Sequence, residues 1–290
     1  MPVATMLSNC NAHATDDHLR ENSHRTAVPY GLVQISKRMR HPPPDWDVMH
    51  WAGRTQGMRI AVVNGQDHRG SSYHMGRILA DKLAADEDIT ELFLPHDLPH
   101  FCRGCYTCLE DETRCPYWDE KKTILDAMEE ADLLIFTSPN YCLAPSGAMK
   151  SFLDMMFDYW VVHRPKGWMF GKRAVVLCTS AGASCRKAMR PIRDSLFFWG
   201  VPYIRTYGLA VQAAGWNNVS ARKKEEIERT LTRLASKLSC DRPPRIGIGT
   251  RLVFSVMRGM HAAGKDSSPA EGRYWEEQGW LGKGRPWKTV

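Results

Sequence analysis

Four closely spaced cysteines are the residues of this chain with the clearest potential for chemistry. They are Cys102, Cys105, Cys108 and Cys115, with two, two and six residues between them. Thiolates at such spacings can converge on one metal centre, and iron–sulfur clusters commonly use a close triplet with a fourth partner. A single zinc ion more often takes its ligands from two pairs that lie farther apart in the chain. The alternative is that these are idle thiols, of which one pair is redox-active.

A second group of candidates lies in segment 64–72, which follows an apolar run and reads Asn-Gly-Gln-Asp-His-Arg-Gly-Ser-Ser. Small residues let backbone N–H groups approach an anion, and the start of the next helix would favour a phosphate. The segment has neither a Walker sequence nor a Gly-x-Gly-x-x-Gly fingerprint. An ordinary turn with a serine N-cap is the alternative. The candidate binding residues are Gly65, Gln66, His68, Arg69, Gly70, Ser71 and Ser72.

Two further segments, 137–146 and 179–184, follow apolar runs in the same way. Proline at both ends stiffens the first, in which Tyr141 offers a flat face to a heterocycle. The second is small enough for a ligand to approach its backbone closely. A partly buried tyrosine and a simple flexible turn are the alternatives. The candidate binding residues are Ser138, Pro139, Asn140, Tyr141 and Cys142 in the first segment and Thr179, Ser180 and Gly182 in the second.

The elements that must position these segments alternate along the chain. Short apolar runs predict strands at 59–63, 89–94, 132–137, 173–178 and 202–210. Amphipathic patterns predict helices over 72–84, 124–131, 146–160 and 188–199, and a last helix to residue 238 that Ser220 caps. This order predicts an α/β fold, a doubly wound five-stranded parallel sheet covered on both faces. Right-handed crossovers then bring the three polar segments to one edge of the sheet.

Composition bounds the class of protein and its surroundings. The 290 residues are 43% hydrophobic, which is enough for a sizeable core, and the formal net charge is +7. We interpret the charge as a solvated basic surface and expect no nucleic-acid binding, because no arginine-rich run alternates with aromatic residues. Nine cysteines without a signal peptide predict a reducing compartment, the cytoplasm. No stretch reaches transmembrane length.

Three regions follow from the pattern along the chain. We expect a disordered or loosely docked N-terminal arm over residues 1–57, which is rich in polar residues and proline. The α/β domain would cover residues 58–240, with a cysteine-rich insertion at 101–120, and a C-terminal extension would cover 241–290. The tryptophans of that extension, Trp275, Trp280 and Trp287, suit docking on a surface or on a partner subunit.

Taken together, the chain resembles the flavodoxin-like NAD(P)H-dependent FMN reductases, in particular their iron–sulfur flavoprotein branch. The most specific stretch runs from Ser138 to Asp154, where that family has a Ser-Pro-x-Tyr turn and a following helix. Lys150, Phe152 and Asp154 match the helix, whereas Met155 stands where arginine is common. The cysteine segment is similar to the family's Cys-x-Gly-Cys-x-x-Cys element. The phosphate segment departs from the family's usual Gly-Ser-x-Arg sequence.

The resemblance implies an oxidoreductase with FMN as cofactor and NAD(P)H as co-substrate. Electrons would pass to a quinone, nitro or azo compound or to a protein, through a 4Fe–4S cluster if the four cysteines hold one. No catalytic side chain is required by such a hydride transfer, and a homodimer is the usual assembly of the family. Two alternatives stay open: a flavodoxin-like carrier or FMN-binding module without reductase activity, and a nucleotide-phosphate binder on the same sheet.

Overall fold

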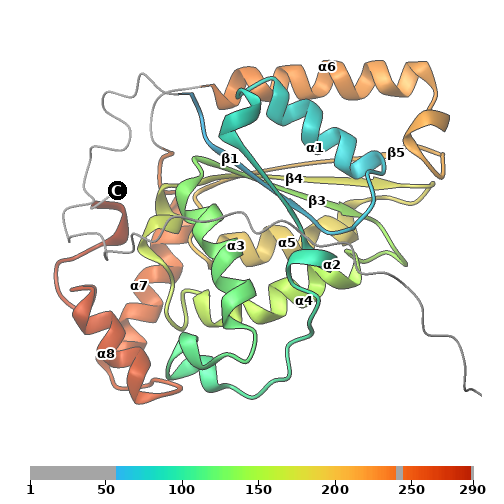
Figure 1. Ribbon diagram of the computed structural model, residues 1–290. Helices are drawn as coiled ribbons and strands as arrows, with labels where there is room; N and C mark the ends of the chain where they lie inside the picture. Colours follow the sequence, from blue (N-terminus) through green and yellow to red (C-terminus); the bar gives the residue numbers. More distant parts are fainter. Residues whose placement is uncertain (1–56, 240–243, 289–290) are drawn as a thin grey trace, which may run out of the picture. The chain divides into compact units, whose positions relative to one another are not determined.

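The computed structural model of this chain describes residues 57–239 and 244–288, all within one unit of the chain. Its centre is a five-stranded parallel sheet in the order β2-β1-β3-β4-β5 (Figure 1). The strands are β1 (Ile60–Asn64), β2 (Ile89–Phe93), β3 (Leu133–Pro139), β4 (Arg173–Ser180) and β5 (Tyr203–Ala210). The three inner strands are wholly buried, as the unbroken apolar runs predict for strands covered on both faces. The predicted flavodoxin-like fold is confirmed.

Helices cover both faces of the sheet, and each layer has its own apolar core. Helices α1 (Ser71–Asp81) and α6 (Ala221–Leu238) cover one face. Helices α3 (Trp118–Glu130), α4 (Gly147–Met155) and α5 (Arg186–Phe198) cover the other, and the short α2 (Leu94–Asp97) follows β2. Two predictions are wrong in detail. The helix predicted to end at residue 160 ends at Met155, and the Ser220 side chain makes no capping hydrogen bond.

Strands β3 and β4 run farther than their apolar patterns predicted. Thr137 pairs with Asn64 of β1, and the parallel register with β4 continues to Pro139 and Thr179. Ser138, Pro139, Thr179 and Ser180 therefore lie in strands instead of loops. Their side chains are buried. The hydroxyl groups of Ser138 and Ser180 donate to nearby carbonyls, whereas that of Thr179 bonds the distant Ser72.

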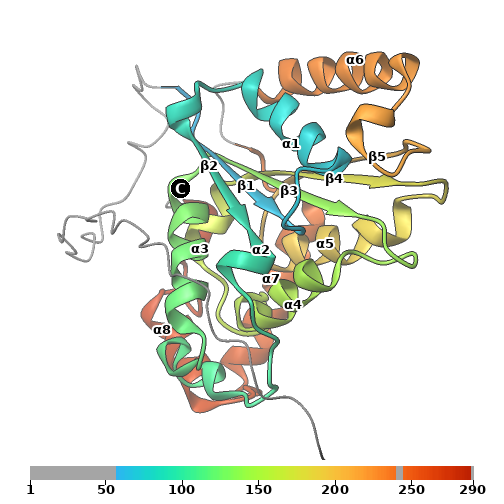
Figure 2. The same ribbon diagram turned by 45° about the vertical axis from the view of Figure 1, so that its right-hand side comes forward.

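The C-terminal extension forms two helices, α7 (Ile248–Ala262) and α8 (Pro269–Glu277), around a separate small core. This core joins Phe254, Trp275 and Trp280 to Val161 and Phe170 of the α/β domain. Trp275 is fully buried and Trp280 nearly so, hence these two rings pack inside the chain and are not free to cover a partner. Figure 2 shows α7 and α8 below the sheet, with α8 near the lower end of α3. The predicted arm at 1–57 lies outside the described residues apart from Gly57.

Within the described ranges, no helix combines the length and the apolar composition needed to span a bilayer.

Candidate functional site

The three polar segments meet at the carboxyl edge of the sheet, where the chain order reverses between β1 and β3. The Gly65 amide donates to the Thr137 carbonyl at 2.8 Å, which joins the first segment to β3. Ser72 Oγ and Thr179 Oγ1 lie 2.6 Å apart, and the Asn140 amide donates to the Thr179 carbonyl at 2.8 Å. The predicted convergence is therefore observed, and such a switch point is where doubly wound sheets bind ligands.

Gly65 is required by this close packing. A Cβ atom on Gly65 would lie 2.7 Å from Ser146 Oγ and 3.0 Å from the Thr137 carbonyl oxygen. Ser146 uses the same hydroxyl twice, because it donates to the Gly65 carbonyl and accepts the Met149 amide at 3.3 Å as the N-cap of α4. The backbone of the first segment is thus held against the start of α4.

Several buried polar atoms at this edge lack a hydrogen-bond partner among the described residues. They are Asn64 Nδ2, both side-chain polar atoms of Gln66, and Asn140 Oδ1. Each unsatisfied buried group costs about 1–3 kcal/mol, so this concentration points to a ligand that completes the bonds. Asn64 is not among the binding residues predicted from the sequence. A polar residue at the end of a wholly apolar strand could have indicated it.

The N-terminus of α1 is suited to an anion. Its N-cap residue, Gly70, supplies no side-chain bond, and the first turn has no acidic residue. The first-turn N–H groups of any helix lack intrahelical acceptors, and the dipole adds positive potential there. Ser71 and Ser72 are buried at this point, whereas His68 and Arg69 are exposed beside it. An uncapped terminus beside the cationic Arg69 suits a phosphate group.

The segment after β3 forms a strained, exposed hairpin. Tyr141 and Ala144 exchange backbone hydrogen bonds of 3.0 and 2.9 Å, and the two residues between them, Cys142 and Leu143, have φ values of 52° and 64°. This left-handed backbone is unusual for non-glycine residues and is often found at binding sites. Tyr141 is 51% exposed, so its ring is free to lie against a flat ligand. The sequence did not predict this hairpin, because it contains no typical turn pair such as Asn-Gly.

Three more predicted residues lie at this edge of the sheet and differ in their structural roles: Ser138, Ser180 and Gly182. Ser138 Oγ accepts the Ser146 amide at 3.0 Å, and Ser180 Oγ donates to the Ala183 carbonyl. Both hydroxyls are therefore committed to shaping the turns. Gly182 is exposed, and a Cβ atom there would meet no other group within 4 Å. The backbone around Gly182 is thus open to a ligand.

The cysteine segment lies between α2 and α3, on the face of the sheet that α4 also covers (Figure 2). Cys102 and Cys105 are exposed, Cys115 is partly exposed and Cys108 is buried. A hydrogen bond from Thr107, 3.3 Å from Cys105 Sγ, lowers the pKa of Cys105, whereas burial raises the pKa of Cys108 to about 12. The surroundings therefore favour the thiolate of Cys105 and disfavour that of Cys108.

Over the ranges that the structure covers, no three of these sulfurs lie within 4.8 Å of one another. Sulfurs around one tetrahedral zinc ion would be about 3.8 Å apart. The segment is thus not arranged as a mononuclear site. In a 4Fe–4S cluster each thiolate binds a different iron, so a wider spacing of the sulfurs is needed.

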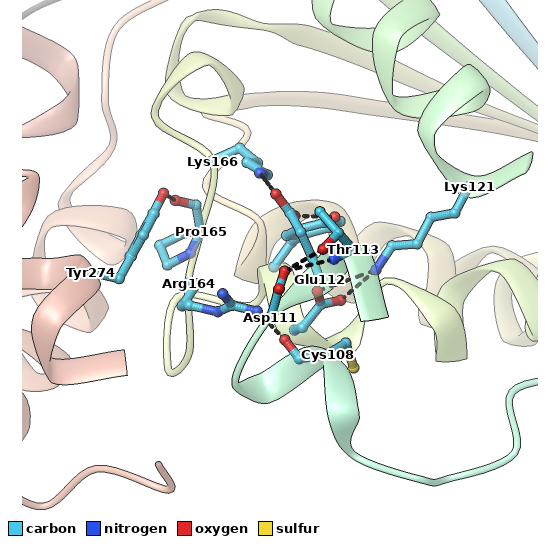
Figure 3. A network of polar contacts seen from close by, with 11 residues as sticks. Cys108, Asp111, Glu112, Thr113, Lys121, Arg164, Pro165, Lys166 and Tyr274 are labelled. Carbon is cyan, nitrogen blue, oxygen red and sulfur yellow. Dashed lines mark hydrogen bonds and ion pairs between the residues drawn. The ribbon is translucent and has the colours of Figure 1, made fainter. Parts of the chain in front are cut away.

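A polar network fixes the cysteine segment to the domain (Figure 3). Glu112 accepts hydrogen bonds from the Tyr159 hydroxyl at 2.6 Å and from Lys166 Nζ at 2.7 Å. Burial raises the pKa of Glu112, but the Lys166 charge and the hydrogen bonds from Lys166 and Tyr159 together outweigh it, and the net pKa lies below its usual range. Arg164 donates to the Cys108 carbonyl. The backbone of the cysteine segment is therefore held by charged groups from elsewhere in the domain.

Behind this network lies a fully buried ion pair. Lys121 Nζ lies 2.9 and 3.2 Å from the two carboxylate oxygens of Asp158, and the side chains are 1% and 0% exposed. Lys121 also sits 4.3 Å above the centre of the Tyr159 ring. Burial of two charges is tolerated only with such complete pairing. The pair joins α3, which follows the cysteine segment, to the short 3₁₀ turn Phe157–Tyr159 that follows α4.

The profile of the family described as NADPH-dependent FMN reductase matches residues 58–215. An iron–sulfur flavoprotein of Archaeoglobus fulgidus is 38% identical over 66 residues, which are 23% of this chain and 29% of that relative. The chain thus spans under a third of that protein.

Two longer matches accompany it. A probable NADPH:quinone oxidoreductase of Oryza sativa is 25% identical over 191 residues, covering 62% of this chain and 88% of the relative. The solved structure of an FMN-dependent NADH-azoreductase from Bacillus anthracis, in complex with FMN, is 12% identical with a TM-score of 0.48. It covers 63% of this chain and 100% of that one.

Proposed function

The chain belongs to the NADPH-dependent FMN reductase family, and from this membership we propose that FMN binds at the carboxyl edge of the sheet. The phosphate would lie at the uncapped start of α1, near Ser71, Ser72 and Arg69. The ring would lie against the exposed Tyr141 and near Asn140 and Gly182. The observation that carries this proposal is the group of buried, unpartnered polar atoms of Asn64, Gln66 and Asn140 at this edge.

Members of this family are oxidoreductases that use FMN and a reduced nicotinamide. Bound FMN supplies the chemistry, since it takes a hydride from NAD(P)H and passes electrons to an acceptor. The side chains of this chain bind and orient, and no acid or base among them is needed for hydride transfer. We propose that the open backbone at Gly182 and the exposed hairpin at 141–144 leave one face of the site accessible to the nicotinamide and then to the acceptor.

The acceptor is proposed to be a small oxidised molecule such as a quinone, nitro or azo compound, or a protein. The similarity to a quinone oxidoreductase of Oryza sativa supports the first class. A carrier or binding module without reductase activity is the competing function. Consumption of NADH or NADPH by the FMN-loaded protein distinguishes the two, because a carrier would leave the nicotinamide unoxidised when a quinone is added.

We further propose that Cys102, Cys105, Cys108 and Cys115 hold a 4Fe–4S cluster. Their fixed backbone, the low pKa of Cys105 and the similarity to an iron–sulfur flavoprotein support this. Burial raises the pKa of Cys108, so the incoming metal would have to displace the proton of this thiol. Anaerobic purification should give iron and sulfide that Cys105→Ser removes. An iron-free protein from that purification would contradict the cluster.

We also propose that the chain forms a homodimer, because this is the usual assembly of the family that it resembles. Exposed apolar side chains are available for it in the described ranges: Phe101, Tyr106, Tyr141 and Leu143 are between 47% and 73% exposed. Light scattering of the FMN-loaded protein should give twice the monomer mass of 33.0 kDa. A monomer at micromolar concentration would contradict the proposal.

The decisive test of FMN binding is a titration of the purified chain with FMN, followed by the loss of free-flavin fluorescence. We expect stoichiometric binding and a yellow protein. Gln66→Leu removes the unpartnered amide without changing the backbone and should weaken binding about tenfold, because each satisfied hydrogen bond contributes about 1 kcal/mol. Gln278→Leu, in the C-terminal extension, is the matched control. Absence of FMN binding to the unaltered chain would contradict the proposed function.

A further inference from the structure

A group of side chains of metal-binding type lies in the C-terminal extension, where Ser268 Oγ donates to the Leu109 carbonyl at 3.0 Å. In the part of the chain that the structure covers, ligand atoms of His261, Asp266 and Glu271 all lie within 4.8 Å of one another. His261 is 5% exposed and Glu271 is fully buried, while Asp266 is partly exposed. We propose that these three side chains bind a divalent transition-metal ion at the junction of α7 and α8.

Local structure brings the three ligands together from a short stretch of sequence. His261 lies in the last turn of α7, Asp266 in the turn that Gly264 makes with a φ of 66°, and Glu271 in the first turn of α8. Gly272 gives the Asp266 carboxylate room, since a Cβ atom there would lie 2.9 Å from Asp266 Oδ2. The two helices therefore form a hairpin whose inner corner holds one imidazole and two carboxylates.

The orientation of His261 is fixed by its neighbours. Its ring stacks on Trp275, with centroids 4.4 Å apart, and Nδ1 is hydrogen-bonded to Asp266 Oδ1. The other ring nitrogen, Nε2, is buried and has no partner among the described residues. A buried imidazole with one unsatisfied nitrogen is an independent observation that points to a ligand at this histidine. A metal ion can use either nitrogen of a neutral imidazole.

Glu271 has the outer support that ligating carboxylates usually have. His163 Nδ1 lies 2.7 Å from Glu271 Oε1, and the Ser267 amide donates to Oε2 at 2.7 Å. Hydrogen-bonded carboxylates of this kind are typical around metal ions.

A purely structural function for Glu271 explains part of this arrangement. Ser268 and Glu271 have the Ser-x-x-Glu spacing of a capping box, but the Ser268 side chain makes no capping bond and Glu271 accepts the amide of Ser267 instead of that of Ser268. The bond from the Ser267 amide helps to hold the start of α8. It does not account for a second carboxylate and an imidazole buried beside the first. The convergence of all three carries the proposal beyond helix capping.

The ligand chemistry selects the class of ion. One imidazole nitrogen with two carboxylate oxygens suits Zn²⁺, Mn²⁺ or Fe²⁺ better than Ca²⁺ or Mg²⁺. Ligand atoms on a tetrahedral ion would be about 3.4 Å apart, so a metal ion bound at Nδ1 would replace the hydrogen bond between His261 and Asp266 and move these two atoms slightly apart. Three protein ligands leave a position for water. Bound metal would link α7 to α8 and, through His163, to the loop that carries Arg164.

The test uses the full chain without an affinity tag, carrying Cys102→Ser, Cys105→Ser and Cys115→Ser so that thiolates do not compete. After chelation and dialysis, Zn²⁺ is titrated calorimetrically and bound zinc is counted by mass spectrometry. We expect one ion per chain. Asp266→Asn and His261→Gln should each weaken binding by at least about tenfold to a hundredfold, and His163→Gln by about tenfold.

His96→Gln is the matched control, because His96 and Asp97 form an exposed pair at 2.9 Å outside the site, and it should leave the affinity unchanged. Co²⁺ in place of Zn²⁺ gives a visible spectrum that reports nitrogen and oxygen ligands and should disappear in Asp266→Asn. Asp266 is partly exposed, so this variant is the one expected to fold. No zinc bound at micromolar concentrations, or equal affinity in Asp266→Asn and His96→Gln, would overturn the proposal.

Discussion

Ser72 and Thr179 share a hydrogen bond of 2.6 Å between their hydroxyl groups, although 107 residues separate them in the chain. Ser72 lies in the first turn of α1 and Thr179 near the end of β4, and both side chains are buried. The bond makes the proposed phosphate segment and the third segment of the site one unit. A substitution at Thr179 should therefore also alter the phosphate segment that contains Ser72.

Thr179→Val tests this coupling, since it keeps the shape of the side chain and removes the hydroxyl. The Ser72 hydroxyl is then left buried without a partner, which costs about 1–3 kcal/mol. We expect the FMN dissociation constant to rise about tenfold and the urea midpoint to fall. Thr232→Val, on the exposed face of α6, is the control. Identical FMN affinities in the two variants would show that the bond does not support the site.

Gly65→Ala tests the close approach between β1 and the start of α4. The added Cβ would meet Ser146 Oγ at 2.7 Å and the Thr137 carbonyl at 3.0 Å. Because a backbone atom cannot move aside cheaply, we expect a loss of about 1–3 kcal/mol in the free energy of unfolding. Gly147→Ala, where nothing lies within 4 Å, should change it by under about 0.5 kcal/mol. Urea titration of both variants gives the comparison.

Lys121→Met tests the buried ion pair. It leaves the Asp158 carboxylate buried without its partner, for which the expected cost is about 3–5 kcal/mol. The neighbouring Lys122 pairs with Asp126 on the surface, so Lys122→Met should cost under about 1 kcal/mol. The measurement is equilibrium unfolding in urea. The double variant Lys121→Met with Asp158→Leu should recover most of the loss, and failure to recover would mean that packing, not charge, is responsible.

Glu112 should make the attachment of the cysteine segment depend on pH. The pKa of Glu112 is lower in the folded protein than its usual value of 4.5. The folded state therefore binds fewer protons, so this contribution to stability is complete above pH 4.5 and is lost as the pH falls through the lowered folded value. Hydrogen exchange of residues 101–115 should accelerate over that acid range. Glu112→Gln should remove the pH dependence, and an unchanged profile would contradict it.

Leu143→Gly tests the strain in the hairpin after β3. Leu143 has a φ of 64°, a conformation that costs a non-glycine residue about 1–2 kcal/mol. Glycine relieves this strain but gives the unfolded chain more freedom, so we expect the stability to be unchanged or to rise by up to about 1 kcal/mol. Leu252→Gly, also exposed but helical, should lose about 1 kcal/mol. Thermal unfolding of both variants checks the opposite signs.

Much of the fold was accessible from the sequence, because buried parallel strands and amphipathic helices leave regular apolar patterns. The strands predicted at 59–63 and 173–178 correspond to β1 and β4, and the segments that follow them meet as expected. The ends of the strands were harder to predict from the sequence. Apolar periodicity does not indicate that Pro139 and Ser180 still pair in the sheet, since their side chains are polar or small.

Residue types and spacing by themselves determined the fold class, the edge of the sheet where polar segments gather and the family resemblance, because these are encoded in local patterns. Only the tertiary structure decided which polar atoms stay unpartnered, as at Asn64 and Gln66, and that Trp275 packs inside the chain. It alone brought His163 to Glu271 across 108 residues. Hydrogen-bond satisfaction and burial depend on neighbours distant in the chain, and no local pattern specifies those neighbours.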